Sequence, residues 1–131
     1  MKRVLITGVF DLLHAGHFKL LRYAKLLGKE LIVAIDSDNR VHQIKGWDRP
    51  YFSQAERKFM LEENKHVDKV LIFNSDEELI KICRDLNPYY RVVGSDWKGK
   101  KIIGEEFSEQ IKYYERIPGY STTNILKGIK P

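Results

Sequence analysis

Two histidines three positions apart, His14 and His17, stand in a glycine-bounded stretch that begins at Gly8. This spacing allows both imidazoles to face the same side of a helix entrance. Imidazoles placed there could donate hydrogen bonds to a polyphosphate and stabilise the charge that builds on leaving oxygens. Gly8 and Gly16 have no Cβ, so the backbone can approach an anion closely. These residue types at this spacing indicate phosphate chemistry.

Other interpretations of the histidine pair are open. A His-x-x-His pair can be half of a metal site, but zinc needs three or four protein ligands. The remaining histidines, His42 and His66, lie in unrelated contexts, so we predict no protein metal ligands. Either histidine alone could be a capping or surface residue. Asp11 could orient one histidine or help to hold a cation.

The histidine stretch joins a strand to a helix. Residues 4–6 are an apolar β-branched run, and residues 18–27 are apolar at helical spacing until Gly28. In an α/β sheet such a join lies at the carboxyl end of the strand, where ligands collect. The helix that follows offers unpaired N–H groups and the positive end of its dipole. The position therefore suits phosphate.

Length and composition are those of an ordinary globular protein. The 131 residues, of which 43% are hydrophobic and 31% charged, suit one domain over residues 1–131 with a single core. No apolar run approaches the roughly eighteen residues that span a bilayer, and no leader opens the chain. The single cysteine, Cys83, cannot form an internal disulfide, and its helical face favours a core position. We therefore expect a cytoplasmic protein without a membrane partner.

The charge favours anionic partners. The 23 lysines and arginines exceed the 18 acidic residues, so the net charge is +5. A polyphosphate substrate fits this charge as well as nucleic acid does. The chain has no basic arm or aromatic-interleaved stripe of the kind that binds nucleic acid. We expect no nucleic-acid partner.

The remaining elements alternate between strands and helices. Apolar runs at residues 31–35 and 70–73 predict further strands, as do residues 91–93 and the alternating residues 112–116. Residues 40–50 look like a polar loop. Capping boxes at Ser53 and Ser75 open two helices, the first with Phe59, Met60 and Leu61 inward. A short helix is expected at 105–110. We predict an α/β fold, Rossmann-like and doubly wound, with a five-stranded parallel sheet and helices on both faces.

Three charged residues could extend the site. Asp38 follows the second strand and could bond a ribose hydroxyl or the substrate, although a helix-cap or turn role is equally compatible with its position. Lys45 lies beside a glycine in the polar loop and could reach a triphosphate. Arg57 stands at a helix start, where a cation opposes the dipole, so a ligand or a partner chain could be its counterpart.

Two later segments could also meet the site. The first and fourth strands flank the point where the winding reverses, so Asp96 and Trp97 should share a crevice with the histidine stretch. Trp97 could cover a base, or pack within its own domain. Near the C-terminus a glycine turn precedes Ser121, a predicted N-cap, and Thr122. This is a second place suited to phosphate.

The motifs resemble those of a known family. His14-Ala15-Gly16-His17 after Gly8-Val9-Phe10-Asp11 resembles the HxGH motif of the cytidylyltransferase-like nucleotidyltransferases. Those enzymes join a nucleoside triphosphate to a phosphorylated small molecule and release pyrophosphate. Lys45-Gly46 resembles the family's mobile-loop lysine. Residues 116–123 resemble its Arg-Thr-x-Gly-x-Ser-Thr motif, except that Ile117 and Pro118 depart from it.

The resemblance, which spans residues 4–129, implies roles for the candidate residues. It implies in-line attack of an acceptor phosphate on the α-phosphorus of the triphosphate, with Mg²⁺ accompanying the nucleotide. It also implies a homodimer. The catalytic set would be His14, His17, Lys45 and Arg116. The nucleotide-binding set would be Gly8, Val9, Phe10, Asp11, Gly16, Asp96, Trp97, Ser121 and Thr122, with Asp38 and Arg57 at the acceptor or an interface.

Members of this family use different substrates, and the chain resembles more than one of them. Residues 94–100 and 51–53, with Arg116, resemble the glycerol-3-phosphate cytidylyltransferases, so CTP and glycerol 3-phosphate are the expected pair. Residues 8–11, 45–46, 49–50 and 121–125 also resemble adenylyltransferases that use heptose 1-phosphate. Adenylyl transfer to flavin mononucleotide is a third possibility. Outside the enzymes, a nucleotide-binding module without turnover is the alternative.

Overall fold

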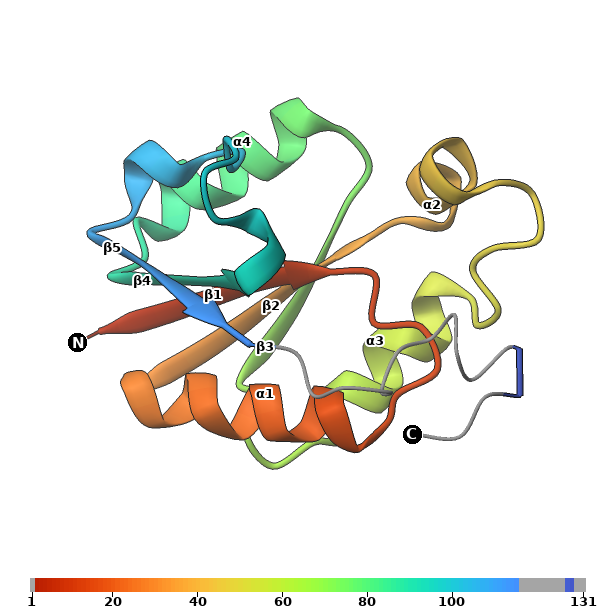
Figure 1. Ribbon diagram of the computed structural model, residues 1–131, viewed down its shortest axis with the longest axis horizontal. Coiled ribbons are helices and arrows are strands. Elements are labelled where there is room, and N and C mark those ends of the chain that lie inside the picture. The colour runs from red at the N-terminus through yellow and green to blue at the C-terminus, as the bar shows by residue number, and fades with distance from the viewer. Residues whose placement is uncertain (1, 116–126, 129–131) are drawn as a thin grey trace.

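Five parallel strands form one sheet in a computed structural model that describes residues 2–115 and 127–128 (Figure 1). In chain order they are β1 (Arg3–Gly8), β2 (Glu30–Asp36), β3 (Lys69–Phe73), β4 (Tyr90–Gly94) and β5 (Gln110–Tyr114). Their order in the sheet is β3-β2-β1-β4-β5. β1 pairs with β2 on one side and β4 on the other, so the winding reverses at β1 and β4. The predicted doubly wound sheet is confirmed.

Helices cover both faces of this sheet, as predicted. They are α1 (Ala15–Leu27), α2 (Asp38–Lys45), α3 (Gln54–Glu62) and α4 (Asp76–Leu86). Figure 1 shows α1 and α3 on one face, α4 on the other, and α2 beyond the carboxyl end of β2. One core cluster joins Leu21 and Leu61 to the sheet, and a second joins Leu79 and Cys83 to its other face. Cys83 is fully buried, which confirms its predicted core position.

Strand alternation decides which side chains share a face. Ile6 packs in the cluster under α1 and α3, whereas Leu5 packs under α4, because successive side chains of a strand point to opposite faces. In the register of β1 and β4, Leu5 pairs with Arg91, and Ile6 pairs with Val92. Arg91, the charged first residue of the predicted strand 91–93, therefore belongs to the α4 face.

The predicted loop at 40–50 is partly a helix. Ser37 caps α2 by accepting a hydrogen bond from the Arg40 N–H, 3.1 Å away, and α2 continues to Lys45. It ends at Gly46, whose φ of +104° suits glycine. Only one residue of α2, Val41, is buried. The helix escaped prediction because its sequence has almost no apolar face, and Lys45 is its last residue rather than a loop residue.

The inward face of α3 also differs from the prediction. Arg57 and Leu61, four positions apart, are both fully buried, whereas Phe59 is 61% exposed. Residues i and i+4 lie on one side of a helix, and i+2 lies nearly opposite. The predicted inward position of Phe59 is wrong because an arginine occupies the inward face.

Smaller differences fall near the end of the chain. The expected helix at 105–110 is a single 3₁₀ turn, Glu105–Phe107, and β5 begins at Gln110. Another 3₁₀ turn, Ser95–Trp97, follows β4. The helix expected from Thr122 onward lies outside the described residues. Within those residues, no helix combines the length and apolar composition needed to cross a bilayer.

Candidate active site

The two histidines close the N-terminus of α1 by capping each other's backbone. His14 is the N-cap, and its Nδ1 accepts a hydrogen bond from the Gly16 N–H at 3.1 Å. The Nδ1 of His17 accepts from the His14 N–H at 3.2 Å. The rings stack with their centroids 3.9 Å apart. Both imidazoles are therefore held at the positive end of the helix dipole.

This capping fixes the tautomer of each ring. A nitrogen that accepts an N–H bond carries no proton, so in the neutral ring the proton resides on the other nitrogen, Nε2. Partial burial lowers the pKa of His14 below its usual 6.5, which favours the neutral ring. Each ring thus has an Nε2–H group as a donor, an arrangement suited to phosphate oxygens.

The loop before α1 is held in a strained shape. Phe10 and Leu12 have φ values of 53° and 51°, the left-handed region that residues with side chains rarely adopt. The Phe10 ring covers Gly8, where an added Cβ would lie 3.0 Å from its Cε2. Asp11 is buried and accepts from the backbone N–H groups of Tyr51 and Phe52. The Asp11 carboxylate therefore fixes the loop before α1 to the backbone of residues 51–52.

A fully buried guanidinium completes this clamp. Arg57 donates to the carbonyls of Val9 (2.9 Å), Asp36 (2.8 Å) and Phe52 (3.0 Å). It also pairs with the Asp38 carboxylate at 2.8 Å. Arg57 thus ties the histidine loop, the end of β2 and the segment before α3 together.

A cleft of about 540 Å³ opens where β1 and β4 end. Eight of the predicted site residues line it: Gly8, Val9, Phe10, His14, Gly16, His17, Lys45 and Trp97. Segments 8–17 and 94–97 do meet there, as the strand order predicts. Asp11, Asp38, Arg57 and Asp96 are not among the lining residues.

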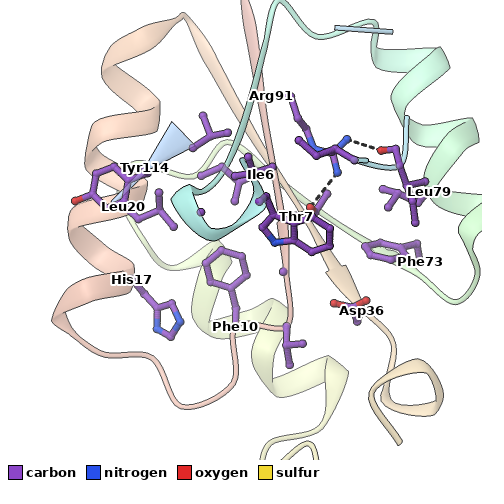
Figure 2. A pocket seen from close by; sticks show the side chains of 18 of the residues that line it. Ile6, Thr7, Phe10, His17, Leu20, Asp36, Phe73, Leu79, Arg91 and Tyr114 are labelled. Carbon is purple, nitrogen blue, oxygen red and sulfur yellow. Dashed lines mark hydrogen bonds between the residues drawn. The ribbon is translucent and has the colours of Figure 1, made fainter. Parts of the chain in front are cut away.

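The cleft has two sides, which Figure 2 shows. The first, which we name the histidine lobe, contains Phe10, His14, His17, Leu20 and Tyr114. The second, the α4-face lobe, contains Thr7, Asp36, Arg40, Phe73, Leu79, Arg91, Ile102 and Ile103. In Figure 2, His17 lies on the opposite side of the cleft from Asp36 and Arg91.

Three charged residues line the α4-face lobe, Asp36, Arg40 and Arg91, and neither arginine was among the sequence candidates. Arg40 bridges Asp36 at 2.9 Å and Asp76 at 2.7 Å. Burial raises the pKa of Asp36, although Arg40 opposes the shift. Arg91 is only 2% exposed, and burial lowers its pKa. One signal could have revealed Arg91, namely a charged residue at the start of a strand predicted to be buried.

Comparison with known proteins identifies the family. A family model described as cytidylyltransferase-like matches residues 5–128. The chain belongs to this family. Over 127 residues the chain is 41% identical to the bifunctional protein HldE of Campylobacter fetus subsp. fetus, a match that covers 97% of this chain and 28% of that protein. Over 129 residues it is 43% identical to the HldE of Helicobacter pylori strain P12, which covers 98% of this chain and again 28% of the relative.

A solved structure supports the same placement. The lipopolysaccharide core biosynthesis protein from Thermoplasma volcanium GSS1 matches with a TM-score of 0.70 and 27% identity, covering 89% of this chain and 97% of that one. Membership of the cytidylyltransferase-like family confirms the predicted class, a nucleotidyltransferase. The chain spans about 28% of the length of these curated relatives. Activities that belong to the rest of those proteins are therefore not assigned to this chain.

Two predicted site residues, Arg57 and Asp38, have internal partners in this cytidylyltransferase-like chain. Arg57 is fully buried and donates to four internal acceptors, so its counterparts in this structure belong to its own chain. Asp38 is the first residue of α2 and the partner of Arg57, outside the cleft lining. An acidic residue in the first turn of a helix is stabilised by the helix dipole, which agrees with the helix-start role that the sequence left open for Asp38.

Three predicted site residues of the family's second motif, Arg116, Ser121 and Thr122, lie outside the described residues. Across residues 2–115 and 127–128, no three His, Cys, Asp or Glu side chains gather in a way that could hold a metal ion.

Proposed function

We propose that the chain transfers AMP from ATP to a sugar 1-phosphate, with heptose 1-phosphate as the acceptor, and releases pyrophosphate. The main support for nucleotidyl transfer is the capped histidine pair at the N-terminus of α1, which lines the cleft. The choice of substrates has other support. Two HldE proteins match nearly the whole chain, and residues 8–11, 45–46 and 121–125 resemble the heptose 1-phosphate adenylyltransferases.

This proposal replaces the sequence-based expectation of CTP and glycerol 3-phosphate. That expectation rested on residues 94–100 and 51–53, with Arg116. The relatives favour the adenylyl alternative over the cytidylyl one. A sugar acceptor also agrees with a solved relative described as a lipopolysaccharide core biosynthesis protein.

The proposed step is an in-line displacement at the α-phosphorus. A phosphate oxygen of the acceptor forms the new P–O bond while the bond to the bridging oxygen of the β-phosphate breaks, and pyrophosphate leaves with that electron pair. The attacking oxygen is already an anion at neutral pH, so no general base is needed. Catalysis would come from positioning and from stabilising charge.

The donors for this step would come from several elements. The Nε2–H groups of His14 and His17 would bond the oxygens on which charge builds. Lys45, exposed at the end of α2 and on the rim of the cleft, would meet the β- and γ-phosphates. From the second motif we propose Arg116, Ser121 and Thr122 as further phosphate contacts. Trp97, 44% exposed at the cleft, and Asp96 would contact the nucleoside.

The remaining expectations become parts of this proposal. Mg²⁺ would arrive on the ATP phosphates and neutralise part of their charge, since a magnesium ion bound with a nucleotide needs few protein ligands. Asp36 is the cleft-lining carboxylate among the described residues, and it is engaged by Arg40. We further propose that residues 1–131 act as one domain and that the protein forms a homodimer.

The nucleotide preference can be measured by pyrophosphate release. The protein and Mg²⁺ are incubated with ATP or CTP and with heptose 1-phosphate, glycerol 3-phosphate or flavin mononucleotide. With heptose 1-phosphate as the acceptor, we expect kcat/KM to be at least about 10-fold higher with ATP than with CTP, the discrimination that one hydrogen bond to a base edge can supply. With ATP, heptose 1-phosphate should be the best of the three acceptors.

Each other result has a defined meaning. A signal that depends on CTP and glycerol 3-phosphate would contradict the adenylyl proposal and restore the cytidylyl one. Nucleotide binding without pyrophosphate from any pair would contradict turnover and favour a binding module.

A further inference from the structure

The helix that carries Lys45 has little apolar attachment to the rest of the protein. α2 has eight residues, and Val41 is the one that is buried. Helices this short are not stable in water by themselves, so contacts with other elements must hold them. Figure 1 shows α2 beyond the carboxyl end of β2. Its attachment must therefore come largely from polar side chains.

Arg40 joins α2 to the ends of three other elements. Its Nε donates to the carboxylate of Asp36, the last residue of β2, at 2.9 Å. One of its Nη groups donates to the carboxylate of Asp76, the first residue of α4, at 2.7 Å. The guanidinium also lies near the ring of Phe73, the last residue of β3, with its Cζ 5.1 Å from the ring centroid. A single side chain thus fixes α2 against β2, β3 and α4.

The bridge is partly shielded from water. The side chains of Arg40 and Asp36 are 16% and 13% exposed, whereas that of Asp76 is 57% exposed. Partly buried charges are screened less by salt than exposed ones. Hydrogen bonds between charged groups are also stronger than those between neutral groups. The contact with Asp36 should therefore be the stronger half of the bridge, and the contact with Asp76 the weaker half.

The second half of α2 depends on this bridge. Within the described part of the chain, the hydrogen bonds and ring contacts of residues 42–45 stay within residues 38–47. Lys45 lies five residues after Arg40, about 7.5 Å farther along the helix axis. It is exposed and lines the cleft. The place of its ammonium group therefore follows from where the bridge holds α2.

We propose that Arg40 is a positioning residue, which bridges Asp36 and Asp76 so that α2 presents Lys45 to the β- and γ-phosphates of the nucleotide. This inference rests on the proposed function and adds to it the contact that places the lysine. Arg40 itself lines the cleft. Its Nε–H and one Nη group are bonded to the two carboxylates, so its effect passes through α2. Asp76 is not a cleft-lining residue, and its replacement tests the bridge without touching a ligand.

The test replaces Asp76 with asparagine, which removes the charge but keeps the shape of the side chain. We expect amide hydrogen exchange of residues 38–45, measured by mass spectrometry without substrates, to become about 3- to 10-fold faster, the effect of weakening one partly exposed charged hydrogen bond. The kcat/KM for ATP should fall by a similar factor. The matched control is Glu77→Gln, which removes the same charge from the next residue of α4, exposed and outside the cleft. It should change neither quantity.

A double-mutant cycle shows whether the effect passes through the lysine. Lys45→Ala should lower kcat/KM for ATP by itself, and adding Asp76→Asn to it should cause no further loss. Asp76→Glu keeps a carboxylate at this position, so its exchange rate and kcat/KM should lie closer to those of the wild-type protein than those of Asp76→Asn do.

Three results would overturn the inference while the proposed function stands. They are unchanged exchange of residues 38–45 in Asp76→Asn, an equal effect of Glu77→Gln, and losses that add fully in the double variant with Lys45→Ala. A wild-type protein that releases no pyrophosphate would instead overturn the proposed function and the role of Lys45. Faster exchange in Asp76→Asn would then support only the attachment of α2 by Arg40.

Discussion

Replacing His17 with alanine is expected to lower kcat by about 10²- to 10³-fold, the cost of removing one donor from a charge-stabilising site. The Nδ1 of His17 accepts from the His14 N–H, so its Nε2–H is the donor that the reaction would use. Steady-state pyrophosphate release with ATP and heptose 1-phosphate measures the loss. The KM for ATP should change far less than kcat, because the charge builds mainly in the transition state.

Two further variants separate catalysis from helix capping. His17→Asn places an amide oxygen near the position of Nδ1, so it keeps the cap acceptor but loses the distal donor. We expect it to unfold at nearly the wild-type temperature and to remain as impaired as His17→Ala. His66→Ala removes a histidine outside the cleft and should be fully active. A wild-type kcat in His17→Ala would refute the donor role.

Replacing Arg57 with methionine should lower the free energy of unfolding by about 3–5 kcal/mol, as expected when one member of a buried ionic network is removed. The change would leave the carbonyls of Val9, Asp36 and Phe52 without their donor. It would also free the loop that carries the histidines, so kcat should fall together with stability. Urea unfolding followed by circular dichroism gives the free energy.

Controls for Arg57 use its own helix. Lys58→Met, at the next position of α3, removes a charge that is not fully buried and should cost little. Arg57→Lys should restore only part of the stability, because an ammonium cannot reach four acceptors in the fork geometry. If the Arg57→Met loss instead disappeared at low protein concentration, the arginine would serve a subunit interface, contrary to its burial.

The sheet could be predicted because its strands are continuous apolar runs. Residues 31–35 are buried on both faces, as such a run requires. The helix N-caps at Ser53 and Ser75 could also be predicted from the sequence. The Ser53 hydroxyl accepts from the Glu56 N–H, and the Ser75 hydroxyl accepts from the Glu78 N–H. The doubly wound pattern then put the first and fourth strands on either side of the point where the winding reverses, which placed the histidine stretch beside residues 94–97.

The missed features depend on contacts between distant segments. Arg57 was expected to meet a ligand or a partner chain because a basic residue at a helix start is unfavourable locally, and only the fold brings three carbonyls to it. The place of Arg91 in the cleft lining was missed, since nothing in its neighbourhood along the chain reveals Thr7 or Ile103 beside it. α2 lacks an apolar stripe, so its cap was its sole signal.

Phosphorus NMR of the reaction products tests the central claim most directly. The wild-type protein is mixed with ATP, Mg²⁺ and heptose 1-phosphate, and the spectrum is followed over time. Attack at the α-phosphorus predicts the paired signals of a nucleoside diphosphate sugar together with pyrophosphate in equal amount, and both should appear about 10²- to 10³-fold more slowly in His17→Ala. Formation of ADP with a newly phosphorylated sugar or free phosphate would place the attack at the γ-phosphorus and contradict the nucleotidyl transfer proposed for this cleft.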